Sequence, residues 1–402
     1  MKFGGTSVAE PTGRAAVARR VQAAIEADTA PVVVVSAMGR AGAPYATDTL
    51  LSMVEGLPTD ERERDLLAST GEVVSAVVTA HELRAVGIDA VAFTGVEAGI
   101  LTDDSHGDAA VTGVDAGPLL AALDAGRVPV VAGFQGVAPD GTITTLGRGG
   151  SDTTACALGV GLGAISVEIY TDVPGVMSAD PRACDGAQVL ETISAEELFQ
   201  MARHGSRVVH TPAAELALAS GLAVRVRGTT SDHAGTLVAD VGHYTPVGVA
   251  TAVTHVENIA RVTVLLPAPE GTAEHMAAQT HVYRAMADAG VSLDMFTPAG
   301  ERLIFTTDAD AVDRACAAVE GLSFDHSVEL SLAKVTLIGA GMHGVPGVMA
   351  RMAEYLAEAD VPVLQAADSH TTISVLIPAA AVTAAVEALH TGFALGESPE
   401  RT

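Results

Sequence analysis

The sequence predicts an α/β domain with a mostly parallel central sheet between helices, followed by two small α+β modules. Strand-like apolar runs alternate with alanine-rich helical stretches up to about residue 240, which is typical of a buried parallel sheet. In the rest of the chain, the same order of strands and a helix occurs twice. A length of 402 residues leaves room for two or three such domains.

The first domain is expected over residues 1–240, with a linker at 241–258 where the pattern loosens. Its clearest elements are apolar runs of strand length and longer helical stretches. We expect strands at residues 31–36, 128–132 and 167–170, and helices at residues 14–26, 72–86 and 153–161. Glycine-rich loops lie between strand and helix, where open α/β sheets bind their ligands.

The two modules are expected at residues 259–330 and 331–402. Each opens as strand, loop, helix, strand, strand, the order of a ferredoxin-like α+β unit. The first has strands at 262–266, 291–296 and 303–306 and a helix at 273–289; the second has strands at 335–338, 362–364 and 372–377 and a helix at 345–359. The repeat by itself does not prove that the modules bind a ligand.

The composition excludes several classes of protein. A net charge of −27 argues against nucleic-acid binding and against anionic membrane surfaces. No apolar run is long enough to span a bilayer, and the N-terminus has no signal-peptide pattern, so we expect a cytoplasmic protein. The cysteines Cys156, Cys184 and Cys316 have no metal-ligand spacing and indicate no structural zinc site.

Lysine is almost absent, because only Lys2 and Lys334 occur among 22 basic residues. A lysine retained in such a composition can be needed as a compact, strongly hydrated point charge. The neighbours of Lys2 support that interpretation. We expect Lys334, at the start of an apolar strand, to be a surface residue.

Lys2 opens a short glycine turn that is followed by two hydroxyl residues and a helix. Gly4 and Gly5 allow a ligand to approach the backbone, and the N–H groups at a helix start bind anions. A lysine beside them can neutralise a phosphoryl group in transfer. A plain tight turn is the alternative, and no Walker A loop occurs in the sequence.

A second group of residues lies at 145–153. Arg148 is flanked by glycines and has open access to a ligand, and its planar fork suits a carboxylate. Ser151 and Asp152 fall where a helix should begin, so capping is the alternative explanation for them. Capping leaves the glycine-rich lead unexplained.

A third group follows the strand at 167–170. Thr171, Asp172 and Gly175 stand at the end of that strand, and Asp180 and Arg182 come soon after it. Polar groups at the ends of parallel strands hold nucleotides, whereas a β-turn at residues 174–175 is the purely structural alternative.

Together these stretches resemble the aspartokinase branch of the amino-acid kinase family. The matching segments are KFGGTSV (2–8), VVVVSAMG (32–39), STGE (69–72), VAGFQG (131–136), TTLGRGGSDTTA (144–155), TDVPGV and ADPR (171–182) and VRVRGT (224–229). The C-terminal half is similar to the paired ACT modules of the same enzymes, most clearly at residues 335–352. The resemblance covers nearly all of the chain.

The resemblance implies an amino-acid kinase fold and ATP-dependent phosphorylation of the L-aspartate β-carboxylate. Lys2, Arg148 and Asp152 would be catalytic, with Glu72 on the substrate ammonium and Arg148 on its α-carboxylate. The implied substrate contacts are Ser36, Thr47, Glu72, Arg148 and Ser151, and the implied nucleotide contacts are Lys2, Gly4, Gly5, Thr6, Ser7, Thr171, Asp172, Gly175, Asp180, Arg182 and Arg207. Mg²⁺ would arrive with ATP, bound chiefly by phosphates and not by identified protein side chains.

Two features depart from the family pattern. The family has a full first strand before KFGGTSV, and here only Met1 precedes Lys2. Either the sequence starts late or a central strand is missing, and we favour a late start because a lost central strand would expose backbone groups. Arg207 stands where family members often have lysine, which changes the shape of the cation near the nucleotide.

The ACT resemblance implies feedback inhibition by an amino acid and a homo-oligomer formed through these modules. The stretches at 39–51 and 363–376 look most like diaminopimelate-sensitive aspartokinases, with lysine and threonine as the other candidate effectors. The expected effector contacts are Met342, Val345, Asp368 and Ser369.

Other functions remain possible at this stage. Glutamate, N-acetylglutamate, UMP and carbamate kinases share the general fold, and the substrate can be an aspartate analogue. A regulatory homologue that binds amino acids without turnover is an alternative of a different class. The presence of Lys2, Arg148 and Asp152 argues against that last alternative.

Overall fold

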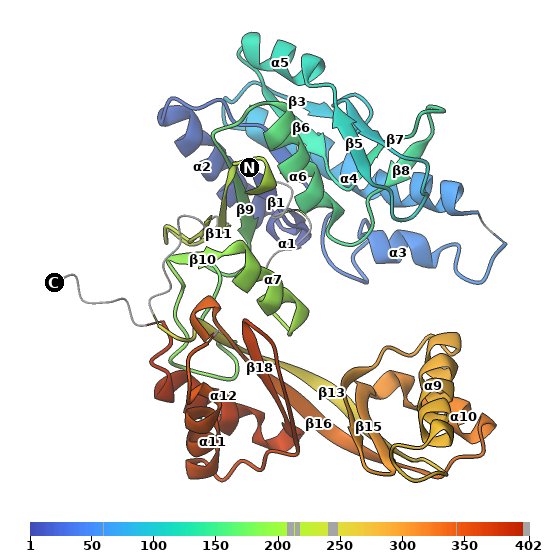
Figure 1. Ribbon diagram of the computed structural model, residues 1–402. Helices are drawn as coiled ribbons and strands as arrows, with labels where there is room; N and C mark the ends of the chain where they lie inside the picture. The colour runs from blue at the N-terminus through green and yellow to red at the C-terminus, as the bar shows by residue number, and fades with distance from the viewer. Residues whose placement is uncertain (59, 207–212, 214–217, 240–247, 343, 397–402) are drawn as a thin grey trace. The chain divides into compact units, whose positions relative to one another are not determined.

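The computed structural model spans residues 1–402 and describes all of them except 59, 207–212, 214–217, 240–247, 343 and 397–402 (Figure 1). The chain forms two compact units. The first comprises residues 1–176, 189–202 and 207–245, and the second comprises residues 177–188, 203–206 and 246–402.

The first unit is built on an eight-stranded sheet in the order β10-β12-β11-β9-β1-β2-β6-β3. All neighbours in it pair in parallel except β11 and β12, so the predicted mostly parallel sheet is confirmed. Its strands are β1 (Lys2–Phe3), β2 (Val33–Val35), β3 (Ala90–Phe93), β6 (Val128–Ala132), β9 (Ser166–Thr171), β10 (Thr192–Ser194), β11 (Ala223–Gly228) and β12 (Thr236–Ala239).

The strand β1 is short but central. It pairs with β2 on one side and with β9 on the other, so the alternative of a missing central strand is wrong. Its two side chains point to opposite faces of the sheet, as the alternation of a strand requires. Phe3 packs in the core and stacks on Tyr170 of β9, with ring centroids 4.6 Å apart.

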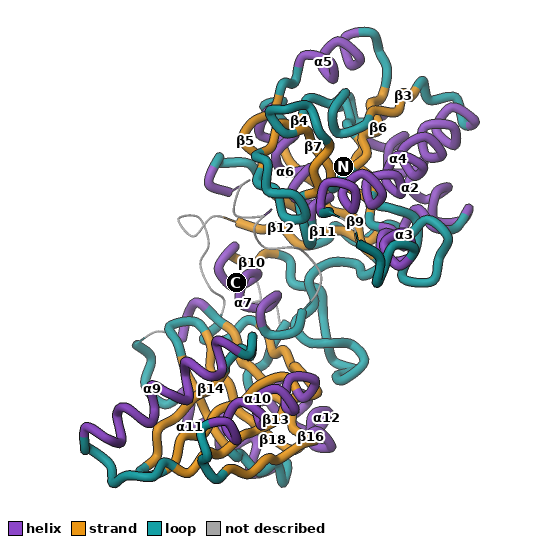
Figure 2. The backbone as a smooth tube through the Cα atoms, turned by 90° about the vertical axis from the view of Figure 1, so that its right-hand side faces the viewer, coloured by secondary structure: helices purple, strands orange, loops and turns teal. Residues whose placement is uncertain are grey.

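Helices cover the sheet on both faces (Figures 1 and 2). Apolar side chains of α2 and α4 share one hydrophobic core with Phe3, Val33 and Val35. The helix α6 lies on the face toward which Lys2 points, because Lys2 pairs with Asp152 of α6. The helices of this unit are α1 (Gly5–Ala9), α2 (Pro11–Glu26), α3 (Thr47–Ser52), α4 (Glu61–Ala85), α5 (Gly117–Asp124), α6 (Gly150–Gly161) and α7 (Ala195–Arg203).

A small second sheet completes the first unit, in the order β5-β4-β7-β8. It consists of β4 (Ile100–Thr102), β5 (Val111–Val114), β7 (Gln135–Val137) and β8 (Ile143–Thr145). The strand β8 leads through residues 146–149 into α6, so this sheet supports the glycine-rich segment around Arg148.

The second unit contains one six-stranded antiparallel sheet in the order β14-β15-β13-β16-β18-β17. The strands are β13 (Ala252–Leu265), β14 (Asp294–Ala299), β15 (Arg302–Asp308), β16 (His326–Ile338), β17 (Gln365–Asp368) and β18 (Thr372–Pro378). The helices are α9 (Ala273–Asp288), α10 (Val312–Gly321), α11 (Val348–Glu358) and α12 (Val382–Gly392).

The predicted repeat is present as two helix pairs on separate hydrophobic cores. One core joins α9 and α10 to β13 and β15, and the other joins α11 and α12 to β16 and β18. The strands β13 and β16 run through both halves. Thus β13 begins inside the segment 241–258 expected to be a linker, and β16 crosses the expected boundary between residues 330 and 331.

The strand predicted at 362–364 begins instead at Gln365. The strand β17 is an edge strand that pairs only with β18, and residues 366–368 are exposed. An exposed edge strand needs no apolar pattern. The prediction, which relied on apolar runs, therefore put the strand on the apolar run just before it.

Lys334 is buried, so its prediction as a surface residue is wrong. It lies in β16 with 7% of its surface exposed and forms an ion pair with Asp294 of β14. Its neighbours Ala333 and Val335 point into the helix-covered core, and alternation places the ammonium on the opposite face of the sheet. A charge pattern cannot reveal a partner forty residues away.

Candidate functional site

The side chains of Lys2 and Asp152 form the centre of the candidate site. The Lys2 Nζ lies 2.7 Å from the Asp152 Oδ1, and the two side chains are only 12% and 9% exposed. Asp152 lies in the first turn of α6, where a carboxylate is favoured by the helix dipole. The pair therefore holds a lysine ammonium in place beside the carboxyl ends of the central parallel strands.

The glycine turn after β1 is held close to the end of β2. The Gly5 carbonyl accepts a hydrogen bond from the Gly39 N–H at 3.0 Å. A Cβ at Gly5 would lie 2.4 Å from the Ala37 carbonyl oxygen and 2.7 Å from that of Gly39. Only glycine fits there, which explains the second glycine by a close backbone approach.

The two hydroxyl residues of α1 differ in their surroundings. Thr6 is exposed, whereas Ser7 is buried and its Oγ lies 2.6 Å from the Thr229 Oγ1. Thr229 is tied in turn to the Thr171 carbonyl at the end of β9. Ser7 therefore joins α1 to the ends of two neighbouring strands, and Thr6 is the hydroxyl open to a ligand.

Glu72 is a buried carboxyl group on α4 with one oxygen in use. Its Oε1 accepts hydrogen bonds from the Ala37 N–H at 3.1 Å and from the Thr47 hydroxyl at 3.5 Å. Its Oε2 is buried and has no hydrogen-bond partner among the residues that the structure describes. Burial raises the pKa of Glu72 to about 7, against the opposing effect of the bonds from Ala37 and Thr47.

Ser36 directly precedes Ala37, whose N–H binds this carboxyl group, and Thr47 binds it through its hydroxyl. Ser36 follows β2, and its N–H donates to the Phe3 carbonyl at 3.1 Å. Thr47 is the first residue of α3, and its hydroxyl faces Glu72. The predicted substrate contacts Ser36, Thr47 and Glu72 are therefore brought together with the turn after β1.

Arg148 is exposed in the loop between β8 and α6. Gly147 and Gly149 on either side have left-handed backbone conformations, with φ of +65° and +73°. Ser151 is buried in the first turn of α6, and its Cβ would lie 2.8 Å from a Cβ at Gly133. The Arg148 side chain is thus exposed, while the residues next to its loop are tightly packed.

The predicted nucleotide residues of β9 also lie at this edge. The Thr171 hydroxyl donates to the Asp172 carboxylate at 3.1 Å, and Asp172 pairs with Arg40 at 2.9 Å. Gly175 is buried, and a Cβ there would lie 2.8 Å from the Thr236 Oγ1. Arg40 was missed in the sequence because a lone arginine in a loop carries no pattern.

Two other predicted nucleotide residues lie in the second unit. Asp180 and Arg182 belong to the second unit, where they pair with each other at 2.7 Å. The Arg182 guanidinium holds the pKa of Asp180 below its usual value, against a smaller effect of burial. Arg207 lies outside the described residues.

The four predicted effector residues lie around the second helix pair of the second unit. Met342 is buried in the core with Val348 and Met352. Val345 is 40% exposed. Asp368 and Ser369 are exposed at the end of β17, where the Ser369 N–H donates to the Thr372 carbonyl at 2.8 Å.

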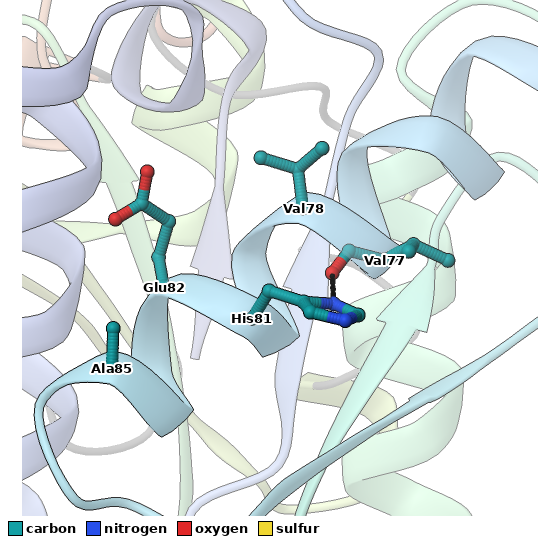
Figure 3. A pocket seen from close by; sticks show the side chains of 5 residues that line it. All are labelled: Val77, Val78, His81, Glu82 and Ala85. Atoms are coloured by element: carbon teal, nitrogen blue, oxygen red, sulfur yellow. Dashed lines mark hydrogen bonds between the residues drawn. The ribbon is translucent and has the colours of Figure 1, made fainter.

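A surface hollow on α4 does not coincide with the site. It has a volume of about 490 Å³ and is lined by Val77, Val78, His81, Glu82 and Ala85 (Figure 3). None of these residues is a predicted contact, and Glu82 is engaged by Arg14 at 3.1 Å. We assign it no role.

Neither a metal-binding group nor a membrane-spanning helix occurs in the described part of the chain. Among the described residues, no group of three or more histidine, cysteine, aspartate or glutamate side chains is arranged to hold a metal ion. Over the same part of the chain, no helix is long and apolar enough to cross a bilayer.

The parallel sheet with a lysine and glycine turn at its carboxyl edge defines a phosphoryl-transfer domain of the amino acid kinase type. Residues 1–228 match the amino acid kinase family, and residues 327–391 match an ACT domain. Aspartokinase 1 of Bacillus subtilis is 41% identical over 404 residues, which is 98% of each chain. The aspartokinase of Mycolicibacterium smegmatis is 38% identical and covers 99% of this chain and 96% of its own.

Solved structures agree with these relatives. E. coli aspartokinase III in complex with aspartate and ADP has a TM-score of 0.73 at 26% identity, over 97% of this chain and 98% of that one. The aspartate kinase of Clostridium acetobutylicum has the same fold, with a TM-score of 0.79 at 20% identity over 98% of this chain and 99% of that one. This chain belongs to the aspartokinases.

Proposed function

We propose that this protein transfers the γ-phosphoryl group of ATP to the β-carboxylate of L-aspartate, giving 4-phospho-L-aspartate and ADP. The observation that carries the proposal is the buried Lys2–Asp152 pair beside the glycine turn at the carboxyl edge of the parallel sheet. The E. coli relative binds both aspartate and ADP, which supports the same pair of ligands here. The reaction would be the first step of lysine, threonine, methionine and diaminopimelate biosynthesis.

The substrate would be held by two groups of opposite charge. The Oε2 of Glu72, which has no partner among the described residues, would accept a hydrogen bond from the aspartate ammonium, with Ser36 and Thr47 as further contacts. Arg148 would bind the α-carboxylate as a planar fork, next to Ser151. Fixing the ammonium and the α-carboxylate leaves the β-carboxylate free to approach the phosphate.

The chemical step needs little proton transfer, since a carboxylate is already a nucleophile. One oxygen of the β-carboxylate forms a bond to the γ-phosphorus, while the bond from that phosphorus to the β,γ-bridging oxygen breaks and ADP leaves. Lys2 would stabilise the charge on the equatorial oxygens of the transferred group, and Asp152 would hold the ammonium in place. The Gly5 N–H and the Thr6 hydroxyl would bind phosphate oxygens beside Gly4, whose own N–H is donated to the Tyr170 carbonyl at 3.3 Å.

The nucleotide would extend along the end of β9. Thr171, Asp172 and Gly175 are the proposed contacts in the first unit, with Ser7 of α1, whose hydroxyl is bonded to Thr229. Asp180, Arg182 and Arg207 are proposed as further contacts. Mg²⁺ would enter on the phosphates of ATP, since this cation keeps most of its ligands from phosphate and water in such sites.

The decisive test is L-aspartate-dependent release of ADP by the purified chain with Mg²⁺ and ATP, with the acyl phosphate trapped by hydroxylamine. We expect a hydroxamate that disappears in Lys2→Ala and Arg148→Ala. A folded protein that gives no hydroxamate with L-aspartate would disprove the proposal. Turnover of an aspartate analogue in the same assay, or amino-acid binding without turnover, would identify the alternative function.

The ACT part of the chain is proposed to bind a feedback inhibitor. E. coli aspartokinase III forms a complex with lysine and aspartate in a T-state, which supports amino-acid regulation in this family. We propose meso-diaminopimelate as the effector here, with Val345, Asp368 and Ser369 as contacts and Met342 as their support. Inhibition assays with diaminopimelate, lysine and threonine, alone and mixed, test this choice, and inhibition by lysine or threonine alone would contradict it.

We propose also that the chain forms a homo-oligomer through the ACT modules. The strands β14 and β17 are the edges of the sheet and most of their residues are exposed, so their backbone groups would be available for pairing with another copy, apart from the Met295 carbonyl, which accepts a hydrogen bond from the Gln365 side chain. Light scattering over a range of concentrations tests this proposal, and a monomer at all concentrations would contradict it.

A further inference from the structure

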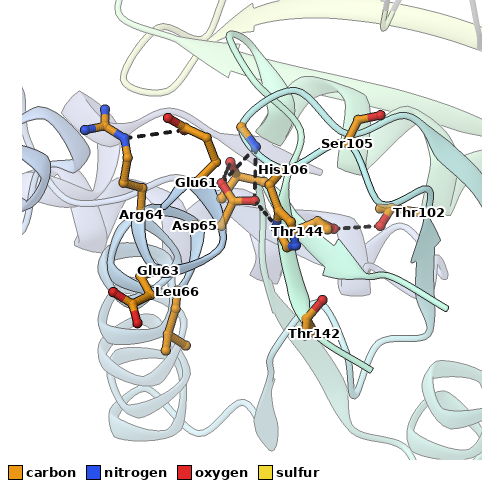
Figure 4. A network of polar contacts seen from close by, with 12 residues as sticks. Glu61, Glu63, Arg64, Asp65, Leu66, Thr102, Ser105, His106, Thr142 and Thr144 are labelled. Atoms are coloured by element: carbon orange, nitrogen blue, oxygen red, sulfur yellow. Dashed lines mark hydrogen bonds and ion pairs between the residues drawn. The ribbon is translucent and has the colours of Figure 1, made fainter. Parts of the chain in front are cut away.

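Asp65 is a buried carboxyl group that the proposed reaction leaves without a role. It lies near the start of α4 and is 2% exposed. Its two oxygens accept hydrogen bonds from the His106 ring at 2.9 Å, from the Gly107 N–H at 3.1 Å and from the Thr145 hydroxyl. Figure 4 shows the carboxylate of Asp65 between α4 and the chain around His106.

Burying a carboxylate costs free energy, even when it accepts four hydrogen bonds from three residues as Asp65 does. Desolvation of the charge must be offset by those hydrogen bonds, and an apolar residue would often be as stable in such a place. A buried group of this kind is therefore a candidate for setting a geometry, and the contacts of Asp65 indicate which geometry.

The first partner of Asp65 is the base of the Arg148 loop. Thr145 is the last residue of β8, and its hydroxyl is bound by Asp65 while its carbonyl accepts from the Ala109 N–H at 2.9 Å. Arg148 follows three residues later in the chain. The hydroxyl and the carbonyl of Thr145 thus both hold the residue from which the loop leaves the sheet.

The second partner is the turn at residues 103–108, which packs against the same loop. A Cβ at Gly147 would lie 2.2 Å from the Asp108 Oδ1, so Asp108 lies directly against the loop. His106 and Gly107 bind Asp65 from this turn. Asp65 is therefore bonded both to the start of the loop and to the turn that packs against it.

The helix α4 also carries Glu72. Asp65 and Glu72 are two helical turns apart, so they lie on one face of the helix. Glu72 is the proposed ammonium contact and Arg148 the proposed α-carboxylate contact. One helix face thus bears one substrate contact directly and anchors the loop that bears the other.

We propose that Asp65, through Thr145, is a positioning residue that sets the place of Arg148 relative to Glu72 and so determines the affinity for the amino-acid substrate. The inference rests on the proposed function, because it assigns Arg148 to the substrate carboxylate. Asp65 itself touches no substrate atom. It acts by fixing the start of the loop and the turn beside it.

The test compares two adjacent threonines of β8. Thr145→Val removes the hydroxyl that binds Asp65 and keeps the shape of the side chain. Thr144→Val is the matched control, because the Thr144 Oγ1 is equally buried but lies 2.6 Å from the Thr102 Oγ1 and is not bonded to Asp65. Both variants lose one buried hydrogen bond and a similar amount of stability.

We expect Thr145→Val and Asp65→Asn to raise the KM for L-aspartate at least tenfold, with the KM for ATP and kcat within about threefold of the wild type. Thr144→Val should leave all three constants unchanged. Equal KM values for aspartate in Thr145→Val and Thr144→Val would overturn the inference. If Asp65→Asn does not fold, the comparison of Thr145→Val with Thr144→Val still tests the inference.

A double-mutant cycle separates positioning from a general loss of structure. The Arg148→Ala variant is expected to lose turnover, so the cycle compares equilibrium binding of L-aspartate, measured by calorimetry. If Asp65 acts through Arg148, Asp65→Asn should raise the dissociation constant of L-aspartate in an Arg148→Ala background by less than twofold. Additive effects would mean that Asp65 does not act through Arg148. Absence of aspartate turnover in the wild type would refute the proposed function instead, which keeps the two failures distinct.

Discussion

Lys2 and Asp152 are 150 residues apart in the chain, and their side chains meet at 2.7 Å with about a tenth of each exposed. The contact joins the two-residue central strand β1 to the first turn of α6. Lys2 is thereby held in one place before any ligand binds, which is the arrangement that electrostatic stabilisation of a transition state requires.

Removal of the Lys2 charge should abolish most of the activity. We expect Lys2→Met to lower kcat by about 10²- to 10³-fold, the loss seen when one preorganised donor to a transition state is removed. Lys2→Arg should lose nearly as much, because a planar fork cannot reproduce a compact ammonium. The measurement is steady-state kinetics with hydroxylamine trapping, and full activity in Lys2→Arg would show that charge alone suffices.

The KM for aspartate should depend on pH through Glu72. Burial raises the pKa of this carboxyl group to about 7, and only its charged form pairs with the substrate ammonium. We therefore expect the KM for aspartate, measured at saturating ATP, to rise as the pH falls from 8 to about 5.5. In Glu72→Gln the KM should be high throughout and should not vary with pH.

Glu72 should also affect stability in a predictable direction. Its pKa in the folded protein is raised from 4.5 to about 7, so the folded state binds the proton more tightly and this group's contribution to stability falls as the pH rises across that interval. Glu72→Gln does not titrate. Its unfolding free energy should increase relative to the wild type between those pH values, by at most about 3 kcal/mol. A constant difference in denaturant titrations would contradict the raised pKa.

The close packing at Gly5 should make it intolerant of alanine. The added methyl group would lie 2.4 Å from the Ala37 carbonyl oxygen, so the turn that receives the phosphates must shift. We expect Gly5→Ala to lower kcat/KM for ATP at least tenfold and to destabilise the protein by about 1–3 kcal/mol. Gly113→Ala is the control, because its Cβ would meet only Leu101 at 3.8 Å, and it should behave as the wild type.

The Lys334–Asp294 pair should behave asymmetrically on mutation. Asp294→Asn leaves a buried ammonium without its counter-charge and should cost about 2 kcal/mol, whereas Lys334→Met should be nearly neutral. Burial opposes the shift, but the bond and charge of Lys334 hold the pKa of Asp294 below its usual value. The stability from this pair is therefore present above about pH 4 and is lost as the pH falls further. Equal destabilisation by both variants would contradict the buried position of Lys334.

Several features of the fold could be predicted from residues alone. The mostly parallel sheet followed from apolar runs that alternate with helices, and the repeat of two α+β units followed from their strand and helix order. Lys2, Gly5 and Arg148 were found because lysine is rare here and because glycines flank them. These signals are local, so a single sequence contains them.

Other features depend on contacts between distant segments. The transfer of residues 177–188 to the second unit puts Ala179 and Cys184 in a core with α11 and α12, although the resemblance had grouped them with the first domain. Asp65 and His106 carry no motif, and only folding brings them to Thr145.

The sequence by itself determined the family, the parallel sheet and the edge of that sheet where the site lies. Strand periodicity and glycine turns depend on residues that are close together in the chain, so a single sequence reveals them. The tertiary structure decided which charges meet and how Lys2 and Lys334 are paired. It also left one buried oxygen of Glu72 without a hydrogen bond from any residue in the described part of the chain. Partners of buried charges are chosen by the packing of segments far apart in the chain, and the pKa of such a group depends on the burial that this packing creates.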